Sequence, residues 1–162
     1  MKNRLIPAVL IAAFVASAGP VATASAAPPT DAGGSGTLSG FCSFDVGYTV
    51  TGKSKTITKP SGERIITSPG QKVTLSANGT TVSYVITGSR RETDVTVGGE
   101  VITEVQVKGR NILVNPIATS ENPGLFLVVG NFNYALDANG VEVRTFNVDG
   151  PGQVTDICQV LS

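Results

Sequence analysis

Turn-forming residues divide the chain beyond residue 40 into short segments, and this division limits its possible folds more than any other feature. Glycine, proline and asparagine recur about every 8–12 residues, a spacing typical of all-β sandwiches and barrels. No segment beyond residue 40 has apolar residues at the period of about 3.6 residues that an amphipathic helix shows. We therefore expect an all-β fold. The turn signals are Gly52, Pro60-Ser61-Gly62, Pro69-Gly70, Asn78-Gly79, Gly98-Gly99, Asn139-Gly140 and Gly150-Pro151-Gly152.

The segment Phe41–Val50 alternates like a strand with one buried face. One of its faces consists of Cys42, Phe44, Val46, Tyr48 and Val50. The segment Gly124–Gly130 is apolar on both faces, which is typical of a strand in the middle of a sheet. Further strands are predicted at 54–59, 63–67, 71–77, 80–87, 93–97, 100–108, 110–118, 124–137, 141–148 and 154–160.

Asn78-Gly79 is predicted to form a two-residue turn, a dipeptide that hairpins favour. Opposite residues then have numbers that sum to 157, so Leu75 faces Val82 and Val73 faces Tyr84. The tripeptide Asn78-Gly79-Thr80 also matches a glycosylation acceptor, but the turn explains the same residues.

At Asn139-Gly140 two arrangements stay open. A two-residue turn would pair Leu136 with Val143, whereas a type I turn would begin at Asp137 and end at Gly140.

This number of short strands favours an antiparallel β-sandwich, with a small β-barrel as the alternative. Cys42 and Cys158 are the only cysteines, and we expect them to form one disulfide. A free nucleophilic thiol or an intermolecular bridge is the alternative. Bonded cysteines need Cα atoms within about 7 Å, so the first and last strands of the domain are predicted to lie close together.

The first 26 residues have the pattern of a cleaved export signal. Lys2 and Arg4 precede the apolar stretch Leu5–Gly19, and Ala24-Ser25-Ala26-Ala27 suits signal peptidase. The apolar run is shorter than the roughly 20 residues that a membrane-spanning helix needs. We expect cleavage after Ala26 or Ala27, a secreted extracellular protein, and no transmembrane segment after cleavage. The residues that follow are predicted to be a flexible leader at 27–40 and a single β-domain at 41–162.

The composition excludes several chemistries. The chain has no histidine, which removes a His-based triad, a His general base and an imidazole metal site. It has 12 basic and 12 acidic residues, a balance untypical of a nucleic-acid-binding protein. We expect no cofactor, because no phosphate-binding loop is present, and no metal, because the chain has neither histidine nor a complete calcium loop. Asp137-Ala138-Asn139-Gly140 resembles only a fragment of a calcium loop.

Paired carboxylates could hydrolyse glycosides without histidine. Most aspartates and glutamates, however, fall in predicted turns or on polar strand faces, and the chain has no tryptophan to line a sugar groove. We therefore expect no enzymatic activity. Basic residues gather at Lys53, Lys55, Lys59, Arg64, Lys72 and Arg90-Arg91. We interpret them as solvent-facing strand positions, some guarding a sheet edge, with a weak patch for polyanions as the alternative.

Gly109-Arg110-Asn111 separates two predicted strands. We expect a kink or bulge there, with Gly109 providing backbone freedom. The functional alternative is a ligand contact by Arg110 and Asn111.

Short motifs in a fixed order resemble a group of small exported actinobacterial proteins without an assigned activity. These motifs are Cys42-Ser43-Phe44-Asp45-Val46, Thr51-Gly52-Lys53, Thr67-Ser68-Pro69-Gly70, Ile86-Thr87-Gly88, Gly109-Arg110-Asn111, Gly124-Leu125-Phe126-Leu127 and Val154-Thr155-Asp156-Ile157-Cys158. The resemblance covers nearly all of the chain beyond residue 40, although 89–100 matches no such motif. It implies secretion and a β-rich fold, and it supplies no catalytic residues.

We hypothesise that the protein is a secreted, non-catalytic β-domain that binds an unknown extracellular partner or has a structural role. The alternatives are a His-free hydrolase with paired carboxylates and a secreted protease inhibitor, for which Ala118–Gly124 is the candidate loop.

Overall fold

The computed structural model describes residues 28–115, 120, 122–146 and 152–162. The predicted export signal at 1–26 lies outside these residues. The strands are β1 (Thr30–Asp31), β2 (Gly34–Leu38), β3 (Val46–Thr51), β4 (Lys53–Thr58), β5 (Arg64–Thr67), β6 (Gln71–Ala77), β7 (Thr80–Ile86), β8 (Ser89–Val97), β9 (Glu100–Asn115), β10 (Gly124–Asp137), β11 (Glu142–Arg144) and β12 (Gly152–Asp156). One short helix, α1 (Ile157–Val160), follows β12.

The strands form two antiparallel sheets, as expected for an all-β chain. The smaller sheet has the order β2-β3-β6-β7, and the larger has the order β1-β4-β5-β8-β9-β10-β11. β12 also pairs with β10, beside the same edge as β11. The sheets of the described residues do not close into a barrel, so the barrel alternative is wrong. No helix in this part of the chain is long and apolar enough to cross a membrane.

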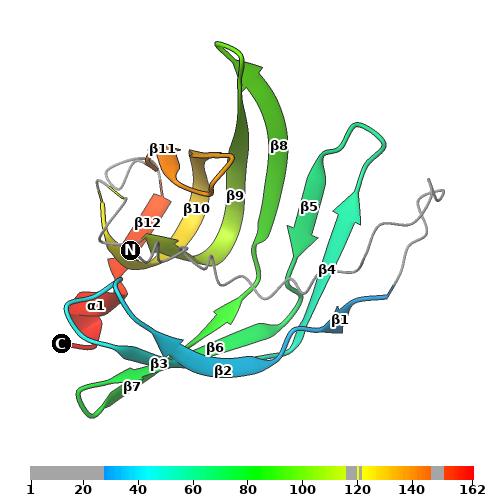
Figure 1. Cartoon of the computed structure of the whole chain (residues 1–162). Coiled ribbons are helices and arrows are strands. Elements are labelled where there is room, and N and C mark those ends of the chain that lie inside the picture. Colours follow the sequence, from blue (N-terminus) through cyan, green and yellow to red (C-terminus); the bar gives the residue numbers. More distant parts are fainter. Residues whose placement is uncertain (1–27, 116–119, 121, 147–151) are drawn as a thin grey trace, which may run out of the picture.

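Four long strands pass through a corner and contribute to both sheets (Figure 1). Each of these long strands consists of two consecutive labelled strands, one in the smaller sheet and one in the larger. The couples are β1 and β2, β3 and β4, β5 and β6, and β7 and β8. Gly52 joins β3 to β4 with a φ of +101°, and its carbonyl oxygen accepts a hydrogen bond from the Ala32 nitrogen at 3.0 Å. A Cβ atom on Gly52 would lie 2.8 Å from the Gly70 oxygen, so only glycine allows these two bends to pack together.

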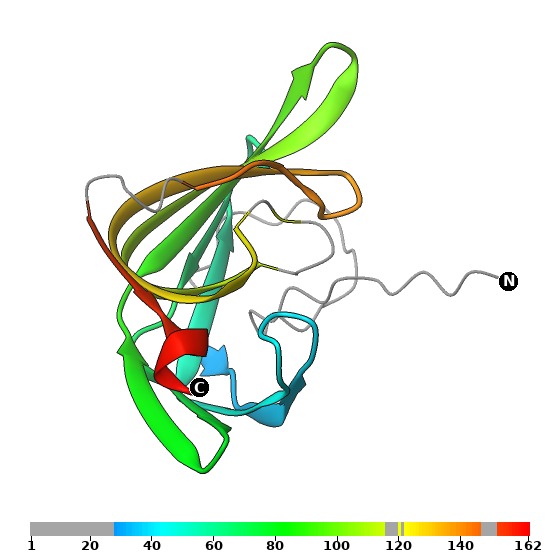
Figure 2. The ribbon, with the colours of Figure 1, turned by 90° about the vertical axis from the view of Figure 1, so that its left-hand side faces the viewer.

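Three glycines lie in register where the larger sheet curls. Gly130 of β10 lies opposite Gly109 of β9 and opposite Gly152 of β12. Their φ angles are +142°, +76° and +140°, a region that glycine occupies without steric cost. The Phe132 ring packs over Gly152, where a Cβ atom would meet it at 2.7 Å. Figure 2 shows β10 following a wide arc around this end of the molecule.

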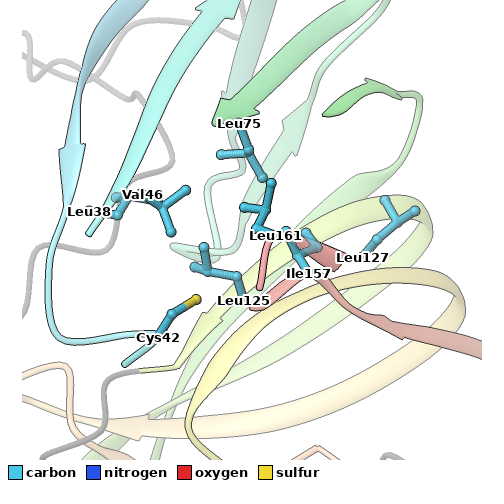
Figure 3. Packing of buried hydrophobic residues seen from close by; sticks show 8 residues of the cluster. All are labelled: Leu38, Cys42, Val46, Leu75, Leu125, Leu127, Ile157 and Leu161. Atoms are coloured by element: carbon cyan, nitrogen blue, oxygen red, sulfur yellow. The ribbon is translucent and has the colours of Figure 1, made fainter. Parts of the chain in front are cut away.

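Two hydrophobic clusters stabilise the fold. The first joins the small sheet to β10 and α1, as Figure 3 shows, and its buried members are Leu38, Cys42, Val46, Leu75, Leu125, Leu127, Ile157 and Leu161. The second contains Val105, Val107, Leu113, Phe126, Val128, Phe132 and Phe146. In it Phe146 meets Phe126 and Phe132 edge-on, with ring centroids 5.5 Å and 6.0 Å apart. Because Leu125 and Leu127 belong to the first cluster and Phe126 and Val128 to the second, β10 is buried on both faces, as predicted.

Cys42 and Cys158 form the predicted disulfide, with Cα atoms 5.5 Å apart. The bridge fastens the loop before β3 to α1, and the two cysteines lie 116 positions apart in the sequence. In the chain-entropy model, closing a loop of this size stabilises a protein by about 4–5 kcal/mol. No free cysteine is present in the described residues.

The hairpin at Asn78-Gly79 has the predicted register throughout, including Leu75 opposite Val82 and Val73 opposite Tyr84. Asn78 and Gly79 have φ angles of 49° and 80°, as a type I′ turn requires. At the second hairpin the type I alternative is correct. The Gly140 nitrogen donates to the Asp137 oxygen at 3.0 Å, and Leu136 pairs with Glu142 rather than with Val143.

The predicted flexible leader at 27–40 is wrong for its described part. Gly34–Leu38 forms β2 and pairs with β3, and Leu38 is buried in the first cluster. Thr30–Asp31 forms β1 and pairs with β4. The Gly- and Ser-rich composition gave no sign of these strands. Their backbone N–H and C=O groups find hydrogen-bond partners on the neighbouring strands, and this pairing needs no run of apolar side chains.

Other boundaries also differ from the prediction, and the strand predicted at 93–97 is β8, which begins at Ser89. The strand expected over Phe41–Val50 begins only at Val46. The segments 100–108 and 110–118 are one strand, β9, which ends at Asn115. β11 covers only Glu142–Arg144 of the predicted 141–148, of which 147–148 lie outside the described residues. The last strand ends at Asp156, because the Asp156 side chain accepts a hydrogen bond from the Gln159 nitrogen and begins α1.

Candidate functional site

A polar groove with a volume of about 580 Å³ lies on one face of β8, β9, β10 and β11. Its lining includes Arg91, Thr93, Glu104, Gln106, Asn133 and Arg144. These strands are neighbours in the larger sheet, as Figure 1 shows, so the groove has a floor of paired backbone rather than of loops.

The register of the sheet explains why these side chains meet. Arg91 lies opposite Gln106, and Gln106 lies opposite Asn133. In an antiparallel sheet residues directly opposite each other share a face, so all three belong to one face, which we call the Arg91 face. The next row of the same face consists of Thr93, Glu104, Ala135 and Arg144.

Ion pairs orient both arginines of the groove. Arg91 Nε lies 2.9 Å from Glu63 Oε1, and Arg144 Nη1 lies 3.3 Å from Glu104 Oε1. The arginine side chains are 50% and 51% exposed, so these pairs contribute little to stability. A guanidinium has five N–H donors, and each of these contacts uses one nitrogen. Both arginines can therefore donate to a ligand while they keep their carboxylate partners.

Lys108 extends the positive charge of the groove. It lies opposite Asn131 in the row beside Gln106 and Asn133, and it is exposed. The three rows therefore hold three cations, Arg91, Arg144 and Lys108, of which the two arginines pair with the carboxylates of Glu63 and Glu104. Guanidinium groups bind planar carboxylates and phosphates with two parallel hydrogen bonds. The groove is thus suited to a polar ligand with negative charge.

The opposite face, which we call the Arg90 face, holds a buried charge cluster. Arg90 Nε lies 2.5 Å from Glu92 Oε1, and the Arg64 Nε–H donates to Glu92 Oε2 at 2.7 Å. The Arg90 and Glu92 side chains are only 8% and 10% exposed. The N–H of Arg90 does not point at the carboxylate, so among the described residues Arg90 Nε makes no hydrogen bond.

Tyr134 packs beside this cluster. The Arg90 guanidinium carbon lies 5.8 Å from the centre of the Tyr134 ring, within the range of a cation–π contact. Burial raises the pKa of the Tyr134 phenol above 10.0, although the positive charge of Arg90 opposes the shift. Tyr134 packs against the second hydrophobic cluster, and Arg64, Arg90 and Glu92 beside it form an ion-pair network.

The basic residues that the sequence groups together do not form one patch. Arg90 and Arg91 point to opposite faces of β8, because adjacent strand residues alternate. Arg64 pairs with Glu92 and Lys59 pairs with Glu63, at 2.7 Å and 3.1 Å. Lys72 lies in the smaller sheet.

Arg110 and Asn111, the predicted alternative ligand contacts, lie beside the corner rather than in the groove lining. The Arg110 oxygen accepts hydrogen bonds from the nitrogens of Thr87 and Gly88, at 3.2 Å and 2.9 Å. Asn111 Nδ2 donates to the Lys108 oxygen at 2.9 Å. The Arg110 side chain is exposed. Gly109, with its positive φ, allows β9 to pass this point without interruption.

The groove lining contains one described carboxylate, Glu104, where a glycosidase needs two. No group of three potential metal-ligating side chains lies in the described part of the chain. The candidate inhibitor loop at Ala118–Gly124 lies largely outside the described residues. Sequence reasoning named Arg91 but missed Gln106, Asn133 and Arg144. The signal that could have found Gln106 and Asn133 is the alternation of polar residues along 100–108 and 131–133, once the pairing of these segments is known.

The comparisons with known proteins add no family to this picture: no family model, no curated protein and no solved structure matches the chain.

Proposed function

We propose that the protein is an exported, non-catalytic binding module that holds an acidic ligand in the groove of the Arg91 face. The observation that carries the proposal is the placement of Arg91 and Arg144 around the amide side chains of Gln106 and Asn133. The ligand chemistry is a carboxylate or phosphate group on a polar molecule, because guanidinium and amide groups donate to such oxygens.

Size and rigidity support the proposal. A volume of about 580 Å³ lies within the range of roughly 300–1,000 Å³ that is usual for small-ligand sites. The side chains stand on paired strands, which hold them in fixed positions before the ligand arrives. Export is supported by the cleavage-type N-terminus, by the disulfide, which persists in oxidising compartments, and by the resemblance to small exported proteins.

Calorimetric titration tests the proposal. The purified protein is titrated with oligogalacturonate as a carboxylate probe, with polyphosphate as a phosphate probe, and with neutral galacto-oligosaccharide as a control. We expect binding of one or both acidic probes and none of the neutral probe. Arg91→Gln and Arg144→Gln should each weaken binding about tenfold or more, because a hydrogen bond to a charged group contributes about 1.5–3 kcal/mol.

The matched control is Lys72→Gln, which removes an exposed positive charge from the smaller sheet and leaves the groove intact. Binding that falls equally in all three variants would indicate a general charge effect rather than a site. Absence of binding to both acidic probes would contradict the proposed function.

A further inference from the structure

The strand β7 is an open edge of the smaller sheet. It pairs with β6 on one side, and among the described residues no strand pairs with its other side between Thr80 and Val85. Figure 2 shows the β6–β7 hairpin at the lower left margin of the molecule. An open edge presents backbone groups that can pair with another chain.

The two-residue turn determines which backbone groups of β7 face outward. Ala77 and Thr80 flank the turn and exchange hydrogen bonds, and the bonded pairs then alternate along the hairpin. The N–H and C=O groups of Thr81, Ser83 and Val85 therefore point away from β6. The next residue of this series supports the assignment, because the Thr87 nitrogen donates outward to the Arg110 oxygen at 3.2 Å.

This edge lacks the features that usually prevent pairing. The sequence from Thr80 to Ile86 has no charged residue, no proline and no glycine, and five of its seven side chains are β-branched. β8, in contrast, no longer pairs with β5 beyond Glu92 and is an edge strand there. This part of β8 carries the charged residue Asp94, which disfavours pairing with another chain. Two contacts also hold the hairpin in place. The hydroxyls of Thr74 and Ser83 lie 2.8 Å apart, and Asn78 Nδ2 donates to the Leu161 oxygen at 3.0 Å.

We propose that two copies of this chain pair antiparallel through β7, around a two-fold axis at Ser83. This register is self-complementary: Ser83 meets Ser83 of the second copy, and Thr81 meets Val85. All three outward-facing residues then form bonded pairs, because an antiparallel ladder bonds at every second residue. The two four-stranded sheets join into one sheet of eight strands. The interface is isologous, as in most homodimers.

The side chains favour the same register. Val85 is 47% exposed, and pairing covers it with Thr81 of the second copy. On the other face Val82 and Tyr84, which pack against the first hydrophobic cluster, come opposite each other across the axis. No charge opposes the contact within β7 itself. A second copy therefore matches this edge in its outward-facing backbone groups and in its lack of charge.

Sedimentation equilibrium of the purified, disulfide-bonded protein tests the proposal. We expect the wild-type mass to approach twice that of one chain as the concentration rises. Ser83→Lys places two like charges directly opposite each other at the axis and should weaken association at least about tenfold. Ser83→Glu should do the same. An equimolar mixture of the two variants should regain the dimer, because the introduced lysine then meets the introduced glutamate only in this register.

The matched control is Ser35→Lys, which puts the same charge on β2, the opposite edge of the same sheet, and should leave the dimer intact. Ser83→Pro is the second disrupting variant, because its lost N–H faces outward and makes no bond to β6. Circular dichroism confirms the fold of each variant. A wild type that stays monomeric at every concentration overturns the proposal, as does a dimer that Ser83→Lys leaves unchanged or a charge mixture that stays monomeric.

Discussion

Gly109 of β9 lies directly opposite Gly130 of β10, at the point where the larger sheet curls around its own aromatic cluster. Gly109 has a φ of +76°, and a Cβ atom there would lie 3.1 Å from the Gly88 Cα atom at the corner. The curl of β9 and β10 and the bend from β7 into β8 therefore depend on the same residue. This contact gives the segment Gly109-Arg110-Asn111 a structural role in the fold.

Gly109→Ala should lower the free energy of unfolding by about 1–2 kcal/mol or more, because an L-residue is strained at a positive φ and the new methyl group meets Gly88. Urea unfolding followed by circular dichroism measures the change. The matched control is Gly34→Ala on β2, where no atom lies within 4 Å of the new Cβ atom and φ is not positive. Equal stability of both variants would show that the glycine row does not shape the sheet.

Removal of the disulfide by the double substitution Cys42→Ala and Cys158→Ala should cost about 4–5 kcal/mol, because the unfolded chain regains the entropy of a long loop. Chemical denaturation of the two forms measures the difference. Titration of the unfolded wild type with a thiol reagent should detect no free thiol before reduction and two after it. Detection of two thiols before reduction would contradict the bridge.

Glu92→Gln should destabilise the fold by about 3–5 kcal/mol, because it leaves the buried Arg90 without its counter-charge. Glu104→Gln is the matched control, since it breaks an exposed pair with Arg144 and should cost less than about 1 kcal/mol. Thermal melts of the two variants give the comparison. Similar melting temperatures would mean that the Arg90 face is open to solvent.

Asp137 gives the protein a stability contribution that depends on pH. Hydrogen bonds from the backbone of Val141, and then from Asn139, lower the pKa of the Asp137 carboxyl below its ordinary value of 3.8. A carboxyl whose pKa is lower in the folded state stabilises the fold above its unfolded pKa, and this contribution is lost as the pH falls through the folded pKa. The wild type should therefore be more stable than Asp137→Asn at about pH 6, and the difference should shrink below about pH 4. Unfolding curves over this pH series measure it, and a constant difference would contradict the role of the charge.

Much of the fold follows from local sequence signals. The register of the β6–β7 hairpin was predictable, because Asn78-Gly79 selects one turn and the turn fixes every later pair. The extent of β10 was predictable because Gly124–Gly130 is apolar on both faces and 131–136 on only one. The disulfide was predictable because the chain has only two cysteines and begins with the pattern of an export signal.

Other parts depend on contacts that a single sequence does not display. β2 has two glycines in five residues, so its pairing with β3 leaves no hydrophobic pattern to detect. The groove combines side chains from four strands, and its composition follows from the register of β9 against β10 rather than from any motif. Arg90 and Arg91 are adjacent in sequence, but their side chains lie on opposite faces of the sheet. The alternation of side chains along a strand predicts this only when the strand is known to include both residues, as β8 does.

The corner shared by both sheets has a consequence for how the molecule comes apart. Each of the four long strands crosses from one sheet to the other, so the same chain segments form part of both sheets. Cleavage or local melting on one side must loosen the other as well, and a stable half-molecule should not be obtainable by limited proteolysis. The two sheets are therefore expected to melt together in a single cooperative transition.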